Sequence, residues 1–206
     1  MKDAVSAAPA SGDLVRVRVW DPFLRAFHWL LAALVVANWL LGHFGPAKMT
    51  LHFWLGYAVL GLLAFRLVWG IVGPPAARFS GFITGPRRIW IYARGLFRRE
   101  PSYVAGHNPM GAWSVVAMLG VLAAQAGAGL ISDPDDFLNV GPLAHLVRPS
   151  TRSAAVGWHN LGGWVILVLV AVHVGIILFY RFWKREDLVR PMITGWKLVR
   201  RPRDGG

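Results

Sequence analysis

The sequence has no cysteine among its 206 residues. This absence excludes structural disulfides, iron–sulfur clusters with cysteine ligands and covalently attached haem, because each of these needs cysteine sulfur. Any metal cofactor must therefore be held non-covalently by other side chains.

Acidic residues are also scarce. The chain has ten Asp and Glu against 22 Lys and Arg, which gives a net charge of +12, and none of the ten lies inside a long apolar run. Histidine and methionine are then the only side chains in these runs that can bind iron. With 55% apolar and 16% charged residues, the composition is that of a membrane protein rather than a soluble domain.

Four apolar runs are long enough to cross a membrane, at about residues 23–41, 51–72, 109–131 and 156–180. The last would be about 37 Å long as a helix, against a hydrocarbon core of about 30 Å. The sequence therefore predicts an all-α membrane protein, with a four-transmembrane-helix bundle as a single domain over residues 16–200. Residues 1–15 contain no apolar run and predict a disordered cytoplasmic tail rather than a signal peptide, and residues 201–206 form a second tail.

Two further segments flank the runs on the basic side. Residues 16–22 alternate in polarity, which is compatible with a strand, but the approach to the membrane favours an interfacial lead-in. In this interpretation Asp21 is the N-cap of the first helix and Pro22 lies in its first turn. Residues 86–99 place aromatic and aliphatic side chains on one arc and arginines opposite, which predicts an amphipathic helix at the membrane surface.

The loop at 132–155 carries Asp133, Asp135 and Asp136 among apolar residues. A helix cap with a solvated turn is the favoured interpretation. A docking face for a basic partner comes second, and a calcium site is the weakest alternative.

Histidines inside the apolar runs are the strongest functional signal. His159 and His173 are 14 residues apart in the last run, close to four helical turns, so they share a face and lie about 21 Å apart along the helix. A titratable side chain in lipid is costly without a partner. Either histidine alone is equally explained by an interhelical hydrogen bond, but the pair at this spacing predicts two haem ligands at two depths.

Lys and Arg positions set the orientation. Eighteen of the 22 flank one side of the predicted membrane, at the N-terminal flank up to Arg25, in the loop 73–108 and from Arg181 onward. Positive residues mark the cytoplasmic side, so both termini are predicted to be cytoplasmic in a bacterial inner membrane. Because the basic residues are divided among membrane-flanking segments, the high charge does not indicate nucleic-acid binding.

With this orientation, the four histidines can be paired by their predicted depth in the membrane. His28 starts the first run at the inner level, as His173 does in the last, and His52 starts the second run at the outer level with His159. Each pair fills both axial positions of an iron, which favours electron transfer over substrate binding at the metal. The second ring nitrogen of each ligand needs an acceptor, and a backbone carbonyl one turn back is the expected one.

Two other polar residues belong to the predicted site. Arg66 lies 14 residues after His52, at the inner level, where it would pair with a haem propionate; snorkelling to the headgroups is the alternative. His107 precedes the third run. His107 could replace His28 as a ligand, hydrogen bond a propionate or a quinone oxygen, or cap the helix together with Asn108. A non-ligand role is favoured.

Two glycines and two further histidines give weaker indications. Gly56 and Gly163 each follow an outer histidine by four residues. They would let a macrocycle approach the backbone, or equally let helices pack closely. His43 and His145 are expected to be solvated in or near outer loops.

Several motifs recur in order along the chain and resemble the bacterial cytochrome b561 family, which includes the b-type cytochrome subunits of nickel–iron hydrogenases. They cover nearly everything after residue 15, namely Trp20-Asp21-Pro22-Phe23-Leu24-Arg25-Ala26-Phe27-His28-Trp29, Ala77-Arg78-Phe79-Ser80, His107-Asn108-Pro109-Met110-Gly111, Phe179-Tyr180-Arg181 and Met192-Ile193-Thr194-Gly195. The resemblance implies a four-helix bundle with two b haems, one ligated by His28 and His173 and the other by His52 and His159. It also implies electron exchange with the quinone pool and with a redox partner.

The sequence thus predicts a di-haem b-type cytochrome that carries electrons across the membrane between quinone and a partner. A periplasmic cytochrome c and a hydrogenase-type protein are the candidate partners. The alternative is a self-contained quinone-linked oxidoreductase such as a superoxide oxidase, with a pocket built from Lys48, Arg148 and Arg152. A haem-free membrane receptor or scaffold is the remaining class.

Overall fold

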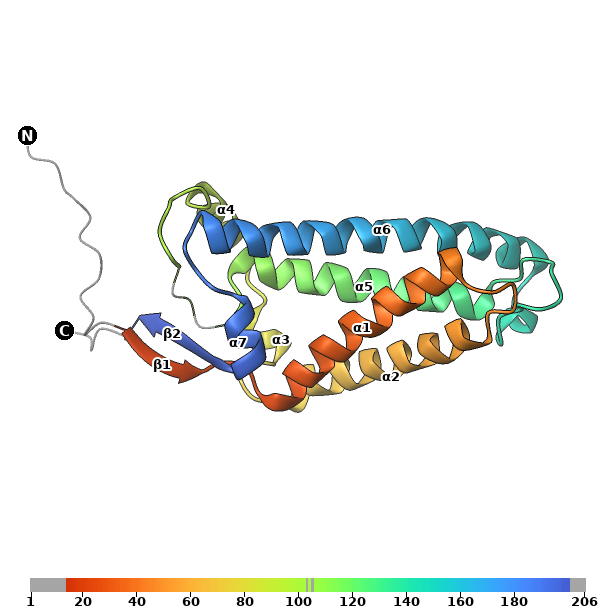
Figure 1. Ribbon diagram of the computed structural model, residues 1–206, viewed down its shortest axis with the longest axis horizontal. Coiled ribbons are helices and arrows are strands. Elements are labelled where there is room, and N and C mark those ends of the chain that lie inside the picture. Colours follow the sequence, from red (N-terminus) through yellow and green to blue (C-terminus); the bar gives the residue numbers. More distant parts are fainter. Residues whose placement is uncertain (1–13, 103, 105, 201–206) are drawn as a thin grey trace, which may run out of the picture.

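Four long helices lie side by side and form the body of the molecule (Figure 1). The computed structural model describes residues 14–102, 104 and 106–200. Residues 1–13 of the predicted tail 1–15 and the predicted tail 201–206 lie outside this part, whereas Leu14 and Val15 belong to a strand rather than to a disordered tail. The long helices are α1 (Pro22–Phe44), α2 (Thr50–Val72), α5 (Pro109–Ile131) and α6 (Pro149–Phe182). Each is long and apolar enough to cross a membrane. The predicted all-α fold with four spans is confirmed.

Helix boundaries follow the apolar runs except at one end. α5 covers the predicted residues 109–131, and Asp21 and Asn108 cap α1 and α5 by accepting backbone N–H groups, each followed by proline in the first turn. α6 begins at Pro149, seven residues before the predicted start. Its first turns are polar, so the end of the apolar run could not mark the end of the helix.

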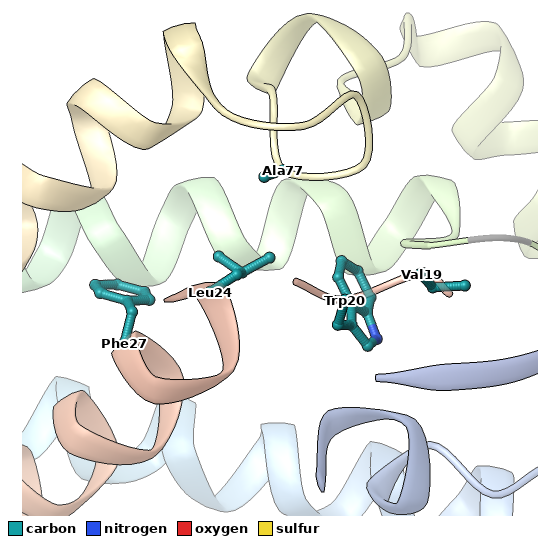
Figure 2. Close-up of a cluster of buried hydrophobic side chains, with 5 residues drawn as sticks. All are labelled: Val19, Trp20, Leu24, Phe27 and Ala77. Atoms are coloured by element: carbon teal, nitrogen blue, oxygen red, sulfur yellow. The ribbon is translucent and has the colours of Figure 1, made fainter. Parts of the chain in front are cut away.

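The bundle is apolar on the outside as well as the inside. α1 packs mainly against α2, and α5 against α6. Val59, Leu63, Leu122 and Ile166 form a buried cluster between α2, α5 and α6. A second cluster at one end joins α1 to the segments before it and after α2 (Figure 2), and consists of Val19, Trp20, Leu24, Phe27 and Ala77. At most 22% of any spanning window is buried, as expected when lipid covers the outer faces.

Strands β1 (Leu14–Arg18) and β2 (Trp196–Arg200) join the two ends of the described chain in an antiparallel sheet. The sheet lies at the same end of the bundle as the short helix α7 (Val189–Thr194), as Figure 1 shows. Gly195, with φ 85°, turns the chain from α7 into β2, and its carbonyl accepts the N–H groups of Val19 and Trp20. The interfacial lead-in predicted for 16–22 is therefore wrong at Arg16–Arg18, because the strand partner is distant in sequence.

Three short helices complete the connections: α3 (Phe79–Phe82), α4 (Pro86–Arg94) and the 3₁₀ helix η2 (Ala144–Leu146). α4 forms within the predicted amphipathic segment 86–99 but ends before Gly95. Its Trp90 and Ile91 side chains are about three-fifths exposed, and Tyr92 faces α6, where its hydroxyl bonds that of Tyr180.

Candidate functional site

His28 of α1 and His173 of α6 face each other at the end of the bundle next to the sheet. Their ring centres are 6.4 Å apart with an angle of 49° between the planes, and both side chains are partly buried. The Nδ1 atom of His28 is buried and has no hydrogen-bond partner within the described residues. We call these two residues the sheet-side pair.

His52 of α2 and His159 of α6 form a second pair at the other end, called the loop-side pair. Their ring centres are 5.8 Å apart at 83°. The Nδ1 of His52 lies 3.2 Å from the carbonyl oxygen of Asn38, and the Nδ1 of His159 lies 3.0 Å from that of Gln125. These acceptors lie on neighbouring helices, so the expectation of a carbonyl one turn back is wrong.

In each pair, the spacing of the two rings fits coaxial ligands on one metal ion. Metal–imidazole bonds of about 2.0 Å, extended by about 1 Å from each nitrogen to its ring centre, place two such rings about 6 Å apart. With Nδ1 of the loop-side pair on a carbonyl, Nε2 is the nitrogen that faces a metal. The described residues contain no group of three or more His, Cys, Asp or Glu side chains that could hold a metal ion. A macrocycle bound between the two rings of a pair would supply the other ligands.

A cavity of about 350 Å³ surrounds the loop-side pair, between all four long helices. Gly56 and Gly163 line it, and a Cβ at Gly56 would meet nothing within 4 Å. Tight helix packing therefore does not explain Gly56, and the open space beside it does fit a macrocycle. Its only charged lining residue, histidines apart, is Asp136.

Two residues of this cavity, Gly129 and Gln125, were missed by sequence reasoning. A Cβ at Gly129 would lie 2.9 Å from Cε1 of His159, so only glycine leaves room for this ring position. Gln125 also donates from Nε2 to the carbonyl of His159, and its polarity inside an apolar run was a readable signal. His43 is exposed at the end of α1, as expected, and there its ring stacks on Trp39 with 4.2 Å between ring centres and borders the cavity.

Arg66 is 2% exposed and lies inside the protein. Its guanidinium carbon is 4.4 Å from the centre of the Phe79 ring and 5.9 Å from that of Phe82, and Nη1 is buried with no partner among the described residues. The snorkelling alternative is wrong, because the side chain does not reach the surface. A buried guanidinium without a carboxylate is suited to an anionic group of a bound cofactor.

His107 is buried beside Arg66. Its ring centre lies 4.7 Å from Trp20 and 4.9 Å from Phe82, and its Nδ1 has no partner within the described part. Burial, and then the positive charges of Arg66 and Lys197, lower the pKa of His107 to about 4. Asn108 alone caps α5, and His28 rather than His107 faces His173. His107 is thus a neutral group with a free hydrogen-bonding nitrogen.

The loop 132–148 holds its aspartates in turns. Asp136 accepts from the backbone N–H groups of Leu138 and Asn139, and these bonds lower its pKa. Asp133 lies 3.6 Å from Arg152, which α6 carries in its first turns. The solvated turn of the favoured interpretation is therefore confirmed, but none of these aspartates caps a helix, and the described residues contain no group of three or more acidic side chains that could hold a metal ion. His145 is exposed, as expected.

Four apolar spanning helices with two facing histidine pairs define the class of protein as a membrane cytochrome of the b type, in which haem is held without covalent bonds. A family model described as prokaryotic cytochrome b561 matches residues 19–195. The chain belongs to this family, its cofactor is haem b, and it carries electrons.

Relatives of similar length support this assignment. The chain is 25% identical to a probable Ni/Fe-hydrogenase B-type cytochrome subunit of Rhizobium leguminosarum bv. viciae, over 94% of this chain and 95% of the relative. It is 25% identical to the protein of the same name from Azotobacter vinelandii, over 89% of each. Identity to the probable Ni/Fe-hydrogenase 1 B-type cytochrome subunit of Escherichia coli (strain K12) is 23%, over 91% and 93%. No solved structure matches the chain.

Proposed function

We propose that the chain conducts electrons across the bacterial cytoplasmic membrane through two b haems, one held by each histidine pair. The observation that carries this proposal is the distance between the two rings of each pair. The ring centres lie 6.4 Å apart in the sheet-side pair and 5.8 Å apart in the loop-side pair, which is the separation of coaxial ligands. Bound haem would supply an iron that is reduced and oxidised by one electron at a time. With both axial positions occupied by imidazole, no position is left for substrate at the metal.

The protein's own groups orient the ligands. The carbonyls of Asn38 and Gln125 fix the loop-side rings in the tautomer that presents Nε2 to a metal. His159 and His173, on one face of α6 and 14 residues apart, set the two sites about 21 Å apart along the helix. This separation lets one site serve each face of the membrane.

Arg66 and His107 would bind polar groups at the sheet side. The unpaired Nη1 of Arg66 and the unpaired Nδ1 of His107 are suited to a haem propionate, and His107, being neutral, equally to a quinone oxygen. We propose that quinone exchanges electrons at one face and a redox protein at the other. The relatives are named as hydrogenase subunits, which supports a hydrogenase-type partner over a periplasmic cytochrome c.

The alternative of a superoxide oxidase has less support. It needs a basic pocket from Lys48, Arg148 and Arg152 next to the loop-side pair. Arg152 is instead directed to Asp133 and to the carbonyl of Val147, and the cavity around the pair is lined by none of the three.

Haem counting tests the proposal. The purified protein should contain two b haems per chain in a pyridine haemochrome assay. His52→Ala or His159→Ala should remove one haem and spare the other, and His28→Ala or His173→Ala should do the reverse. A wild-type value near one haem per chain contradicts the di-haem function, and equal loss of both haems from every substitution contradicts the pairing.

Quinone exchange has a separate test. In liposomes, a quinol analogue should reduce the haems and a quinone should oxidise them. If neither reaction occurs, the link to quinone is wrong while the haem count stands.

A further inference from the structure

We propose that Arg66 makes the sheet-side site the more oxidising of the two, so that electrons move downhill from the loop-side pair to the sheet-side pair. This inference rests on the proposed binding of one haem by each pair. It concerns the reduction potentials of the sites, which the fold alone does not order.

The first observation is the charge of Arg66. Its side chain is 2% exposed, and its Nη1 has no partner among the described residues. The Asp21 carboxylate attracts it from a distance, but no carboxylate of the described residues forms an ion pair with it. Its guanidinium rests on Phe79 and Phe82 instead, so solvent screens it little. An iron that gains an electron becomes less positive, and a nearby buried cation stabilises that reduced state. Pairing of Arg66 with a propionate would act in the same direction, because the guanidinium would then offset the negative charge of that carboxylate.

Arg66 belongs to the sheet-side site rather than the loop-side site. It lies 14 residues after His52 in α2, which places it about 21 Å further along the helix. Phe82 contacts both the Arg66 guanidinium and the His107 ring. The His107 ring also contacts Trp20, which belongs to the same buried cluster as Phe27, the residue before His28. Arg66 and His28 are therefore linked through packed side chains at the same end of the bundle.

The loop-side pair has hydrogen-bond acceptors for its Nδ1 atoms and no basic residue lining its cavity in the described part of the chain. Both of its Nδ1 atoms lie within 3.2 Å of a backbone carbonyl. Donation of Nδ1–H to an acceptor raises the basicity of an imidazole ligand, which favours oxidised iron. Among the described residues, no Lys or Arg lines the cavity around this pair. His28, by contrast, has a buried Nδ1 without an acceptor in the described residues. Ligand basicity and charge therefore order the two sites in the same direction.

The absence of cysteine allows the ordering to be measured without changing either site. Phe137 is 95% exposed, next to Asp136, which lines the loop-side cavity. A gadolinium chelate on Phe137→Cys would label the chain at this single position. In a redox titration followed by electron paramagnetic resonance, the haem whose relaxation the chelate accelerates is the loop-side one. It should titrate at the lower potential.

Charge substitutions test Arg66 itself. Arg66→Gln should shift the sheet-side potential downward and leave the loop-side potential in place, while Arg66→Lys should keep both near the wild-type values. Arg181→Gln is the matched control. It also removes one positive charge, but from an exposed position in the last turn of α6, where solvent screens the charge. A merely structural role for Arg66 would change stability without moving one potential selectively.

The outcomes separate this inference from the proposed function. A tagged protein with two haems, in which the chelate-marked haem has the higher or an equal potential, overturns the ordering alone. A protein with one haem contradicts the di-haem proposal and the ordering with it. If Arg66→Gln loses the sheet-side haem, the order of the two potentials is decided by the chelate-labelled Phe137→Cys protein, which keeps Arg66. If Arg66→Gln keeps both haems and shifts neither potential, Arg66 does not set the order.

Discussion

Gly129 shows how a single missing side chain shapes the site. The His159 ring occupies the space that a Cβ at this position would need, with Cε1 at 2.9 Å and Nδ1 at 3.2 Å. At the same time, the carbonyl of Gln125, one turn earlier on α5, holds Nδ1 of the ring. The orientation of His159 is therefore fixed from two sides by one helix.

We expect Gly129→Ala to displace the His159 ring and to lower occupancy of the loop-side haem site severalfold, with the sheet-side site retained. Haem stoichiometry and the visible spectrum of the purified variant provide the measurement. Gly127→Ala is the matched control, since a Cβ there meets nothing within 4 Å on the same helix. Full occupancy of both sites in Gly129→Ala would show that the ring can move without losing the ligand.

At the scale of elements, a small polar network fastens strand β2 to the loop before α5. Lys197 of β2 bonds Glu186 at 2.8 Å, with side chains only 9% and 5% exposed. Glu186 also accepts from the backbone N–H and the hydroxyl of Ser102, both at 2.7 Å. The network closes the end of the bundle where the sheet-side pair lies.

The ion pair predicts an acid-sensitive sheet. Burial raises the pKa of Glu186, but the Lys197 ammonium and the Ser102 bonds outweigh burial, so its pKa is lowered. The ionised carboxylate thus contributes stability above the ordinary carboxyl pKa, and this contribution is lost as the pH falls through the lowered value in the folded protein. Protease cleavage near the C-terminus should accelerate over that acid range.

Breaking the pair should have the same effect at neutral pH. Glu186→Ala leaves a buried, unpaired Lys197, and loss of one partner of a buried pair costs about 3–5 kcal/mol. Asp187→Asn is the control, because its bond to Arg181 is exposed and such pairs contribute about 0–1 kcal/mol. Thermal unfolding in detergent measures both variants. Equal melting temperatures would show that the buried pair does not hold the sheet.

For the whole molecule, the central prediction is orientation. The sheet brings residues 14 and 200 together at one end of the bundle, and most Lys and Arg flank this end in the sequence. The positive-inside rule then places this end in the cytoplasm. A reporter fused after Gly206 should be active only as a cytoplasmic marker. Periplasmic activity would reverse the proposed faces of the two haem sites, but not their order of potential.

The sequence by itself determined the four spans and the shared face of His159 and His173. Both follow from local geometry, since the rise and turn of a helix depend only on the residues within it. The same reasoning extended to the levels of His28 and His52, because the run in which each lies and the side from which it starts can be read along the chain.

Only the tertiary structure decided how helices meet. The carbonyls that bond His52 and His159 and the space at Gly129 depend on rotation and tilt between helices, which periodicity does not encode. The pairing of β1 with β2 joins segments at opposite ends of the sequence, and alternation in one strand does not name its partner. Burial of Arg66 likewise depends on Phe79 and Phe82 folding back over α2, a contact set by packing rather than by local sequence.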